Sequence, residues 1–546
     1  MRYCLPLAAF LVLLTVNPVA TVSTLPGKDY SATASQASFW VFFTDKEGVA
    51  FDPYDYFDEK AIQRRKAHGI CLYDPLNFPV KEEYIHQIEK LTDKPLVVSR
   101  WFNAVHLTLC RFEAIALEEL DFVREVRPAS MRLVPAAAGF PFVGFSAVGK
   151  EHEKLFRTQK THMYTGYFRE RGLDGSGIRI AVFDAGFRGV KTHAAFRHLY
   201  ENDQIIATWD FHRQRENVYV SSAHGTMVLS AIAGILDEGP VGMATGAEFL
   251  LARTEIFREP LAEEQYWLAA VEWADRMGAD IINSSLGYIF HRYFPEEMDG
   301  RTSLVARAAT IAAQKGILVV NAAGNMGNND QWRIIVTPAD ADSVLTVGAL
   351  EFPSMLRASY SSVGPTADGR RKPNVSALGT VIAANRRRLT TVSGTSFASP
   401  QVTAFAACLW QNFPTMSNMD LFRAIERSAS LHPYYDYAHG HGVPRASYFF
   451  DDRIAVARPT FDLSFKNDSV RIRLREFIQL NPDTEDQNKA GNEYLYYQLR
   501  NETGSIEKYF VLDLQDANKL IISVEGFKPG KELLVHFRGY TSGIRL

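Results

Sequence analysis

The sequence predicts an α/β protein built on a mostly parallel sheet, with a small α+β unit before it and a small all-β unit after it. Between about residues 178 and 349, short β-branched runs alternate with helical segments, which indicates a parallel sheet covered on both faces. The uncharged stretch at residues 134–149 separates this region from an earlier unit. From about Ile454, short alternating strands between Asn, Asp and Gly turns predict a small sandwich.

Length and composition indicate a globular protein of several domains. The chain has 546 residues, of which 47% are hydrophobic and 22% charged, the usual balance for a protein with a sizeable core. The formal net charge is only −3, which gives no reason to expect nucleic acid or an anionic membrane as a partner. We expect a monomer.

The first twenty residues have the pattern of a signal peptide. Arg2 provides the positive end, Leu5 to Val16 is apolar, and Pro18-Val19-Ala20 ends the segment with small residues. The alternative is an N-terminal membrane anchor, but the apolar run is about half of the ~20 residues needed to cross a bilayer. We therefore predict a signal peptide at residues 1–20, no transmembrane segment, and a secreted or extracytoplasmic protein in the periplasm or at the cell surface.

The four cysteines do not form a recognisable framework. Their positions, Cys4, Cys71, Cys110 and Cys408, match neither a metal knuckle nor a disulfide scaffold. Cys71 and Cys110 could pair or could be two small buried thiols, and the sequence leaves both open.

The first unit has its own hydrophobic periodicity. We expect strands at Ser38 to Thr44, Pro95 to Ser99, Ala104 to Leu109 and Phe122 to Val126, and helices at Glu59 to His68, Lys81 to Leu91 and Ala114 to Leu120. The second of these helices is amphipathic, whereas the first is mainly charged.

The central unit has the strand and helix alternation described above. We expect strands at Ile178 to Phe183, Phe249 to Ala252, Ile281 to Ser284, Ile317 to Asn321 and Val344 to Ala349, and helices at Gly225 to Ala233, Gln265 to Met277 and Leu304 to Lys315. The apolar strands are typical of a sheet that is buried on both faces.

Two polar residues of the central unit are candidates for acid–base chemistry. Asp184 ends a buried strand in AVFDAG, where α/β sheets place catalytic groups, although a turn or helix-capping Asp is the commoner role for a single such residue. His224 begins an apolar helix in HGTM, and the helix dipole there is expected to lower its tendency to ionise, so that it can act as a neutral base.

Two further residues could support nucleophilic attack. Ser396, in GTSFASP, stands at the start of an apolar helix, where free backbone N–H groups can receive an oxyanion. Pro400 is expected within the first turn, which needs few backbone donors. Asn325 follows a buried strand, and its side-chain amide can donate to an oxyanion.

These segments follow one another in the order Asp, His, Asn, Ser. In subtilisin the catalytic residues occur along the chain in the order Asp, His, Ser. This order differs from the order in chymotrypsin and in the α/β-hydrolases. AVFDAG, HGT, AAGN and GTSFASP resemble the aspartate, histidine, oxyanion-hole and nucleophile motifs of the subtilisin-like serine proteases. The resemblance covers about Gly175 to Ala446, half of the chain.

The resemblance implies a subtilisin-like three-layer fold and a secreted serine endopeptidase of bacterial type. It implies Asp184, His224 and Ser396 as the triad, Asn325 in the oxyanion hole, and peptide or protein substrates. The substrate-binding residues that it implies are Ser285, Leu286, Gly287, Ala323 and Gly324. Small residues in these segments would leave room for a large or apolar side chain on the substrate residue that precedes the scissile bond.

The resemblance also implies an inhibitory prodomain in the N-terminal unit, removed by self-cleavage in the linker. The resulting domain plan is a signal peptide at 1–20, a prodomain at 36–130, a linker with the processing site at 131–160, a catalytic domain at 161–450 and a β domain at 454–546. A permanent accessory domain is the alternative for the N-terminal unit.

No cofactor or metal is expected. Many members of the family carry a calcium-binding loop after the histidine helix, but Ile235 to Pro240 leaves little room for one. Two other functional classes are less favoured. A catalytically inactive scaffold would have lost a triad residue, and an α/β-hydrolase esterase would need a G-x-S-x-G motif with the histidine last.

Overall fold

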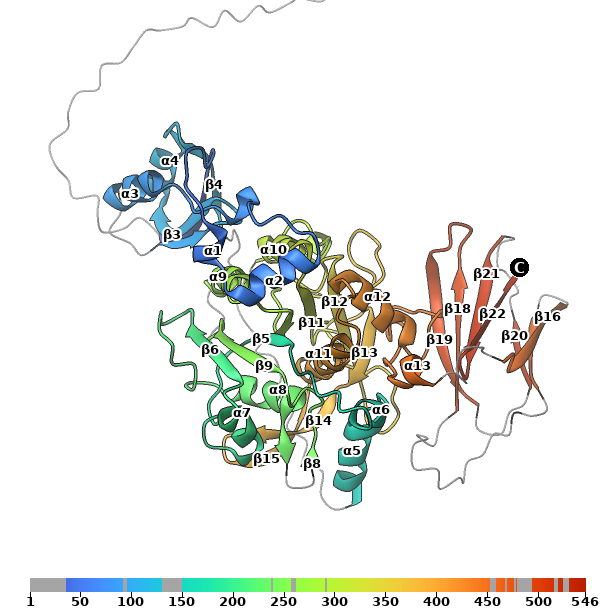
Figure 1. Cartoon of the computed structure of the whole chain (residues 1–546). Coiled ribbons are helices and arrows are strands. Elements are labelled where there is room, and N and C mark those ends of the chain that lie inside the picture. Colours follow the sequence, from blue (N-terminus) through green and yellow to red (C-terminus); the bar gives the residue numbers. More distant parts are fainter. Residues whose placement is uncertain are drawn as a thin grey trace, which may run out of the picture.

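The computed structural model describes residues 36–91, 96–129, 150–236, 239–256, 262–289, 292–451, 458–466, 469–475, 478, 493–514, 519–523 and 530–546. Three units follow one another along the chain, with the central α/β unit between the N-terminal unit and the C-terminal β strands (Figure 1). The expected signal peptide lies outside the described residues. Among those that are described, we find no helix with the length and apolar character of a transmembrane span.

A parallel sheet of seven strands forms the centre of the molecule, as the sequence predicts. Its order is β13-β12-β11-β10-β5-β9-β6, and every neighbouring pair is parallel. The strands are β5 (Arg179–Asp184), β6 (Ile205–Asp210), β9 (Glu248–Arg253), β10 (Ile281–Ser284), β11 (Leu318–Ala322), β12 (Val344–Leu350) and β13 (Val375–Leu378). The sequence pattern did not reveal β6 or β13 as strands.

Helices cover both faces of this sheet, which explains why its strands are apolar throughout. Alternate residues of β5 belong to two different cores: Ile180 and Val182 pack with α8 (His224–Ala233) and α11 (Thr395–Asn412), whereas Ala181 and Phe183 pack with α9 (Glu263–Arg276) and α10 (Leu304–Gln314). The predicted three-layer architecture is therefore confirmed.

The N-terminal unit is an antiparallel sheet of four strands in the order β2-β3-β1-β4. The strands are β1 (Gln36–Phe43), β2 (Val97–Ser99), β3 (Ala104–Cys110) and β4 (Val123–Pro128), and the helices are α1 (Pro53–Tyr56), α2 (Glu59–Ala67), α3 (Glu82–Leu91) and α4 (Arg111–Glu118). One face of the sheet packs on α3 and α4. The other face presents Trp40 and Phe42 to α9 and α10 of the central unit.

The C-terminal unit consists of two antiparallel sheets around one core, so the predicted all-β class is confirmed. One sheet contains β16 (Phe461–Lys466), β17 (Ser469–Leu474) and β20 (Lys519–Ser523); the other contains β19 (Ile506–Asp513), β18 (Tyr494–Arg500), β21 (Glu532–Phe537) and β22 (Tyr540–Arg545). Tyr434 of the central unit packs its ring against Tyr496.

The remaining elements of the central unit are short or peripheral. They are α5 (Lys150–Thr161), α6 (Gly166–Arg169), α7 (Arg197–Glu201), β7 (Ile235–Leu236), β8 (Gly239–Pro240), α12 (Asn418–Ser428), α13 (Ser447–Phe450) and the hairpin β14 (Thr380–Asn385) with β15 (Arg388–Ser393). Helix α5 falls within the stretch expected to be a linker. Its Gln159 exchanges two hydrogen bonds with the backbone of Ile382, so the end of that stretch packs on the central unit.

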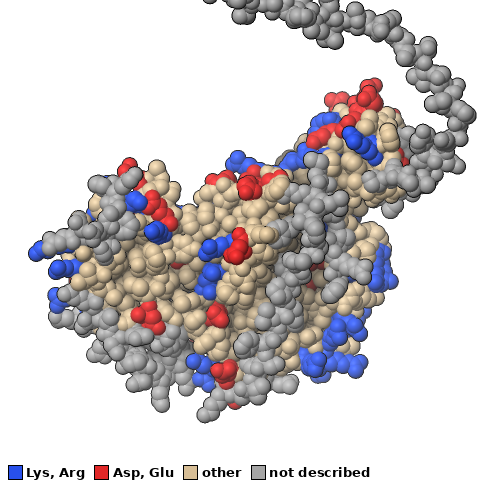
Figure 2. All heavy atoms as spheres, turned by 180° about the vertical axis from the view of Figure 1, so that it is seen from behind, with Lys and Arg blue, Asp and Glu red and all other residues tan. Residues whose placement is uncertain are grey.

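In Figure 2, acidic and basic side chains are both scattered over the face seen from behind, in keeping with the small net charge. Cys71, Cys110 and Cys408 are free thiols, so Cys71 and Cys110 do not pair in this structure.

Candidate active site

Asp184 and His224 meet at the carboxyl ends of the parallel strands. Asp184 is the last residue of β5 and is fully buried, and His224 is the first residue of α8. The imidazole Nδ1 lies 2.9 Å from both carboxylate oxygens of Asp184. Gly225 permits this approach, because a Cβ there would lie only 2.9 Å from the Asp184 Cβ.

The electrostatics of His224 differ from the sequence-based expectation. Burial lowers the pKa of His224, but the charge and the hydrogen bond of Asp184 raise it more, so that the pKa lies above its ordinary value of 6.5. The expected lowering by the helix dipole is therefore wrong in sign. A carboxylate in direct contact with the ring outweighs the partial charge of a helix end.

Ser396 is the second residue of α11, and its hydroxyl is close to the segment that follows β10. The N–H of Ser396 is one of the first four of the helix and has no acceptor within it. The Ser396 hydroxyl donates to the Ser285 carbonyl at 3.1 Å. The Phe397 ring lies 5.4 Å from the His224 imidazole, so the first turn of α11 borders the Asp–His pair.

The sequence predicts Pro400 within the first turn of its helix, but Pro400 is the sixth residue of α11. A proline at this position removes the N–H that would bond to the carbonyl of Ser396, four residues earlier. The Ser285 hydroxyl replaces it and donates to that carbonyl at 2.9 Å. Pro400 thus helps to tie the serine helix to Ser285.

The side-chain amide of Asn325 is held in one orientation. Its Oδ1 accepts hydrogen bonds from the backbone N–H and the hydroxyl of Thr395, both at 2.9 Å. Its Nδ2 faces Gly394, where a Cβ would lie 3.6 Å away. The donor end of the amide is therefore directed at the residues that precede Ser396. Sequence reasoning did not identify Thr395, although it stands within the GTS motif.

The segments expected to bind substrate lie side by side. Ser285, Leu286 and Gly287 follow β10, Ala323 and Gly324 follow β11, and these two strands are neighbours. The buried Val336 packs between them: a Cβ on Gly287 would lie 2.2 Å from one of its methyl groups, and a Cβ on Gly324 would lie 2.6 Å from the other. Sequence reasoning missed Val336, which reaches this place only through the fold of the loop after Asn325.

Metal binding has no support in the part of the chain that the structure describes. There, no three His, Cys, Asp or Glu side chains gather in a way that could hold a metal ion. The groups that the site presents are a carboxylate, an imidazole, a hydroxyl and amide donors.

A buried carboxylate, an imidazole and a helix-borne serine at one edge of a parallel sheet are typical of serine hydrolases. Comparison with known proteins gives the family. The Subtilase family (Peptidase S8) matches residues 175–447, and the Peptidase S8 propeptide domain of Bacteroidota matches residues 38–138. The chain therefore belongs to the subtilase family and is a subtilisin-like serine protease with an N-terminal propeptide domain.

Individual relatives match about half of this chain in sequence, and one solved structure matches most of it. Subtilisin DY of Bacillus licheniformis is 28% identical over 261 residues, which are 48% of this chain and 86% of that protein. The thermophilic serine proteinase of Bacillus sp. (strain AK1) is 30% identical over 268 residues, 49% of this chain and 60% of that protein. The crystal structure of fervidolysin from Fervidobacterium pennivorans has a TM-score of 0.49 at 16% identity and covers 93% of this chain and 72% of that chain.

Proposed function

We propose that this protein is a secreted endopeptidase that hydrolyses peptide bonds through Asp184, His224 and Ser396 and that matures by cutting its own linker. The observation that carries the proposal is the contact of the His224 Nδ1 with both oxygens of the buried Asp184 carboxylate, beside the helix that bears Ser396. The direct test is hydrolysis of peptides by the purified protein and its block by a serine-directed phosphonate. A purified, folded protein that neither cleaves peptides nor reacts with the phosphonate would contradict it.

The proposed reaction begins when the Ser396 hydroxyl turns from the Ser285 carbonyl to the Nε2 of His224. His224 takes the proton as the oxygen attacks the peptide carbonyl, and Asp184 holds the ring and stabilises its charged form. His224 then gives the proton to the leaving amine. Water attacks the acyl-enzyme in the same way and releases the acid product.

Asn325 and the N–H of Ser396 are proposed to bind the oxyanion that forms during attack. Asn325→Ala is expected to lower kcat by about 10²–10³-fold with little change in KM, because the hydrogen bond forms fully only in the transition state; subtilisin is the source of this magnitude. Steady-state kinetics on a peptide substrate measure the split. The control is Asn329→Ala, in the same loop, whose Oδ1 caps only the Gln331 N–H. A raised KM with normal kcat would contradict the role of Asn325.

Ser285 to Gly287 and Ala323 to Gly324 are proposed to line the pocket for the side chain before the scissile bond. The small residues among them, taken alone, favour a large substrate side chain, but Val336 fills the space between the two glycines. We therefore propose a preference for small residues at this position.

Val336→Gly is expected to raise kcat/KM for a substrate with Phe before the scissile bond, relative to Ala, by about tenfold or more, the usual size of such pocket effects. Paired peptides that differ only at this residue measure the ratio. Ile335→Val is the matched control, since it shortens the neighbouring buried side chain without opening the space between the glycines. An unchanged Phe to Ala ratio in Val336→Gly would exclude Val336 as a determinant of specificity.

The domain plan is likewise a proposal: signal peptide at 1–20, prodomain at 36–130, catalytic domain at 161–450 and β domain at 454–546. The sequence predicts the processing site within residues 131–160; because α5 packs on the catalytic domain, we propose that the cut falls within residues 130–149, ahead of Lys150. These residues lie outside those described. We propose that the cleaved prodomain inhibits the enzyme until it is degraded, and that the mature enzyme acts outside the cytoplasm.

A further inference from the structure

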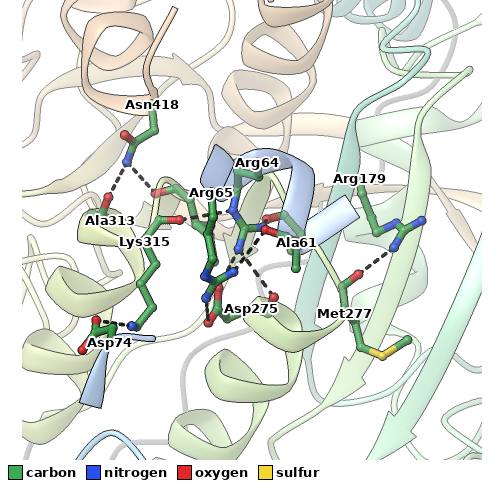
Figure 3. A network of polar contacts seen from close by, with 12 residues as sticks. Ala61, Arg64, Arg65, Asp74, Arg179, Asp275, Met277, Ala313, Lys315 and Asn418 are labelled. Carbon is green, nitrogen blue, oxygen red and sulfur yellow. Dashed lines mark hydrogen bonds and ion pairs between the residues drawn. The ribbon is translucent and has the colours of Figure 1, made fainter. Parts of the chain in front are cut away.

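Residues 52–77 of the prodomain form a segment that we call the clamp. It contains α1, α2 and the short helix η2 (Pro75–Asn77), and it lies between β1 and α3, outside the four-stranded sheet of the prodomain. The clamp contacts the catalytic domain where α9 and α10 end and where strands of the sheet begin (Figure 3). The sheet of the prodomain packs separately on α9 and α10, so the clamp is a second contact.

The centre of the clamp is a buried group of three charges. One carboxylate oxygen of Asp275, in α9, pairs with Arg64 and the other with Arg65, each at 2.5 Å. All three side chains are at most 2% exposed. Figure 3 shows both guanidinium groups converging on this carboxylate from α2. The Arg65 guanidinium also lies 3.9 Å from the centre of the Phe57 ring.

Arg64 additionally binds backbone carbonyls in the segments that follow two helices of the catalytic domain. It donates to the carbonyls of Ala279 and Lys315, which follow α9 and α10. Buried backbone carbonyls need a hydrogen-bond donor, and a guanidinium with several N–H groups is well suited to bind more than one of them. The prodomain thus satisfies backbone groups of the catalytic domain.

Three ion pairs surround this centre, and in each the two domains contribute opposite charges. Lys315 of the catalytic domain pairs with Asp74 at 2.8 Å, Arg179 with Asp58 at 2.9 Å, and Asp280 with Lys60 at 3.1 Å. Each of the two surfaces carries charges of both signs. The surface of the catalytic domain is therefore specifically complementary to the clamp.

The clamp is remote from the triad. Arg179, which binds the clamp, is the first residue of β5, and Asp184 is the last residue of the same strand. Five residue steps along a strand span about 16 Å. The clamp therefore binds the edge of the sheet opposite the active site, and occupation of the cleft by a substrate does not compete with it.

We propose that the clamp is a second docking site that keeps the cleaved prodomain on the catalytic domain even when the cleft is free. This inference rests on the proposed cleavage in the linker. When the prodomain leaves the cleft, the clamp still holds it on the catalytic domain. Its rebinding to the cleft is then intramolecular and is favoured by a high effective concentration. Release then requires both the clamp and the sheet contact on α9 and α10 to separate, or the prodomain to be degraded.

The experiment uses the full precursor with Ser396→Ala and a recognition site for a specific external protease inserted into residues 130–149. This protein can be cut on demand and cannot digest its own prodomain. After cleavage, the dissociation rate of the prodomain is measured by size-exclusion at timed intervals after dilution. We expect the cleaved prodomain to dissociate slowly from the parent protein. In Asp275→Asn it should dissociate faster by roughly 30-fold or more, because this change leaves two buried arginines without their carboxylate.

Two further variants keep the test decisive. Lys60→Ala changes a partly exposed side chain of α2 and is expected to speed release about two- to fivefold without disturbing the fold. Asp462→Asn, which breaks an exposed ion pair with Arg475 in the C-terminal unit, should release at the parental rate. Circular dichroism establishes that each variant is folded.

Parental release rates in folded Asp275→Asn and Lys60→Ala would overturn the proposal, as would immediate dissociation of the parent after cleavage. Because the cut is made by an external protease, these outcomes do not depend on whether the protein processes itself. Failure of self-processing is detected separately, by intact-mass analysis of the chain with Ser396 restored.

Discussion

Ser396→Ala is expected to abolish peptide hydrolysis, with kcat lowered by about 10⁶-fold, and to prevent labelling by a serine-directed phosphonate. Without the hydroxyl, His224 has no proton to remove and no acyl-enzyme can form; the magnitude comes from the equivalent change in subtilisin and not from this chain. The residual rate should come from direct attack of water on a peptide carbonyl whose developing negative charge the oxyanion donors stabilise. Initial rates with a chromogenic peptide and intact-mass analysis after phosphonate treatment provide the measurements.

The same variant tests processing. In a host that lacks other proteases, Ser396→Ala should accumulate as a precursor that keeps the prodomain joined to the catalytic domain, whereas the wild type is cut within residues 130–149. N-terminal sequencing locates the cut. If the variant is cut at the same bond, another protease performs the cleavage. If the active wild type retains residues 36–128 covalently, the N-terminal unit is an accessory domain rather than a removable prodomain.

Ser417→Ala is the matched control. Ser417 also stands at the start of a helix, where its hydroxyl accepts from the Asp420 N–H and caps α12. Its loss should lower stability by about 1 kcal/mol and leave hydrolysis, labelling and processing intact. Equal loss of activity in Ser417→Ala and Ser396→Ala would show that the assay responds to helix capping and not to the nucleophile.

The parts of the fold that the sequence predicts well are those in which local pattern and burial agree. Ile281 to Ser284 is a strand with the expected bounds, because its four residues are all buried and two isoleucines begin the segment that leads to the site. His224 begins its helix as expected. The two strands that the pattern missed in the central sheet, β6 and β13, are flanked by polar or proline-rich sequence and carry half-exposed or small residues.

Features that depend on distant partners could not be predicted. The helix with Lys60, Arg64 and Arg65 has the composition of a solvated surface helix, yet its two arginines are buried because Asp275, about two hundred residues later, provides a carboxylate for both. Likewise, nothing local to Val336 indicates that it packs between Gly287 and Gly324. In both cases the information lies in the tertiary arrangement.

The direction of the His224 pKa shift is another feature that depends on a distant partner. The sequence shows a histidine at a helix start, which favours a lowered pKa. The pKa is raised because Asp184, forty residues earlier, contacts the ring through both of its oxygens. The carboxylate that fixes the orientation of the base therefore also sets its basicity.

Asp184→Asn is expected to lower kcat by about 10⁴-fold, a magnitude known from the triads of other serine proteases. The shape of the Asn side chain preserves the packing at this buried position. Its amide N–H, however, can donate to Nδ1 of His224 and so place the imidazole proton on Nε2. An Nε2 that carries a proton cannot accept one from Ser396.

The pH dependence gives a second readout that simple loss of structure would not produce. In the wild type the pKa of His224 is raised, and the base is active when neutral, so activity should rise as the pH increases through a value above 6.5. In Asp184→Asn the charge that raises the pKa is gone and burial, which lowers it, remains. The acidic limb of the residual activity should therefore move to lower pH.

The profile of kcat/KM against pH, measured for the wild type and Asp184→Asn, tests this shift. Asp436→Asn is the control, because Asp436 forms a second buried carboxylate–imidazole contact with His439, at 3.0 Å, within the loop after α12. Its loss removes a comparable pair without touching His224, so the position of the acidic limb should not change. An acidic limb at the wild-type pH in a folded Asp184→Asn protein would mean that Asp184 does not set the basicity of the catalytic histidine.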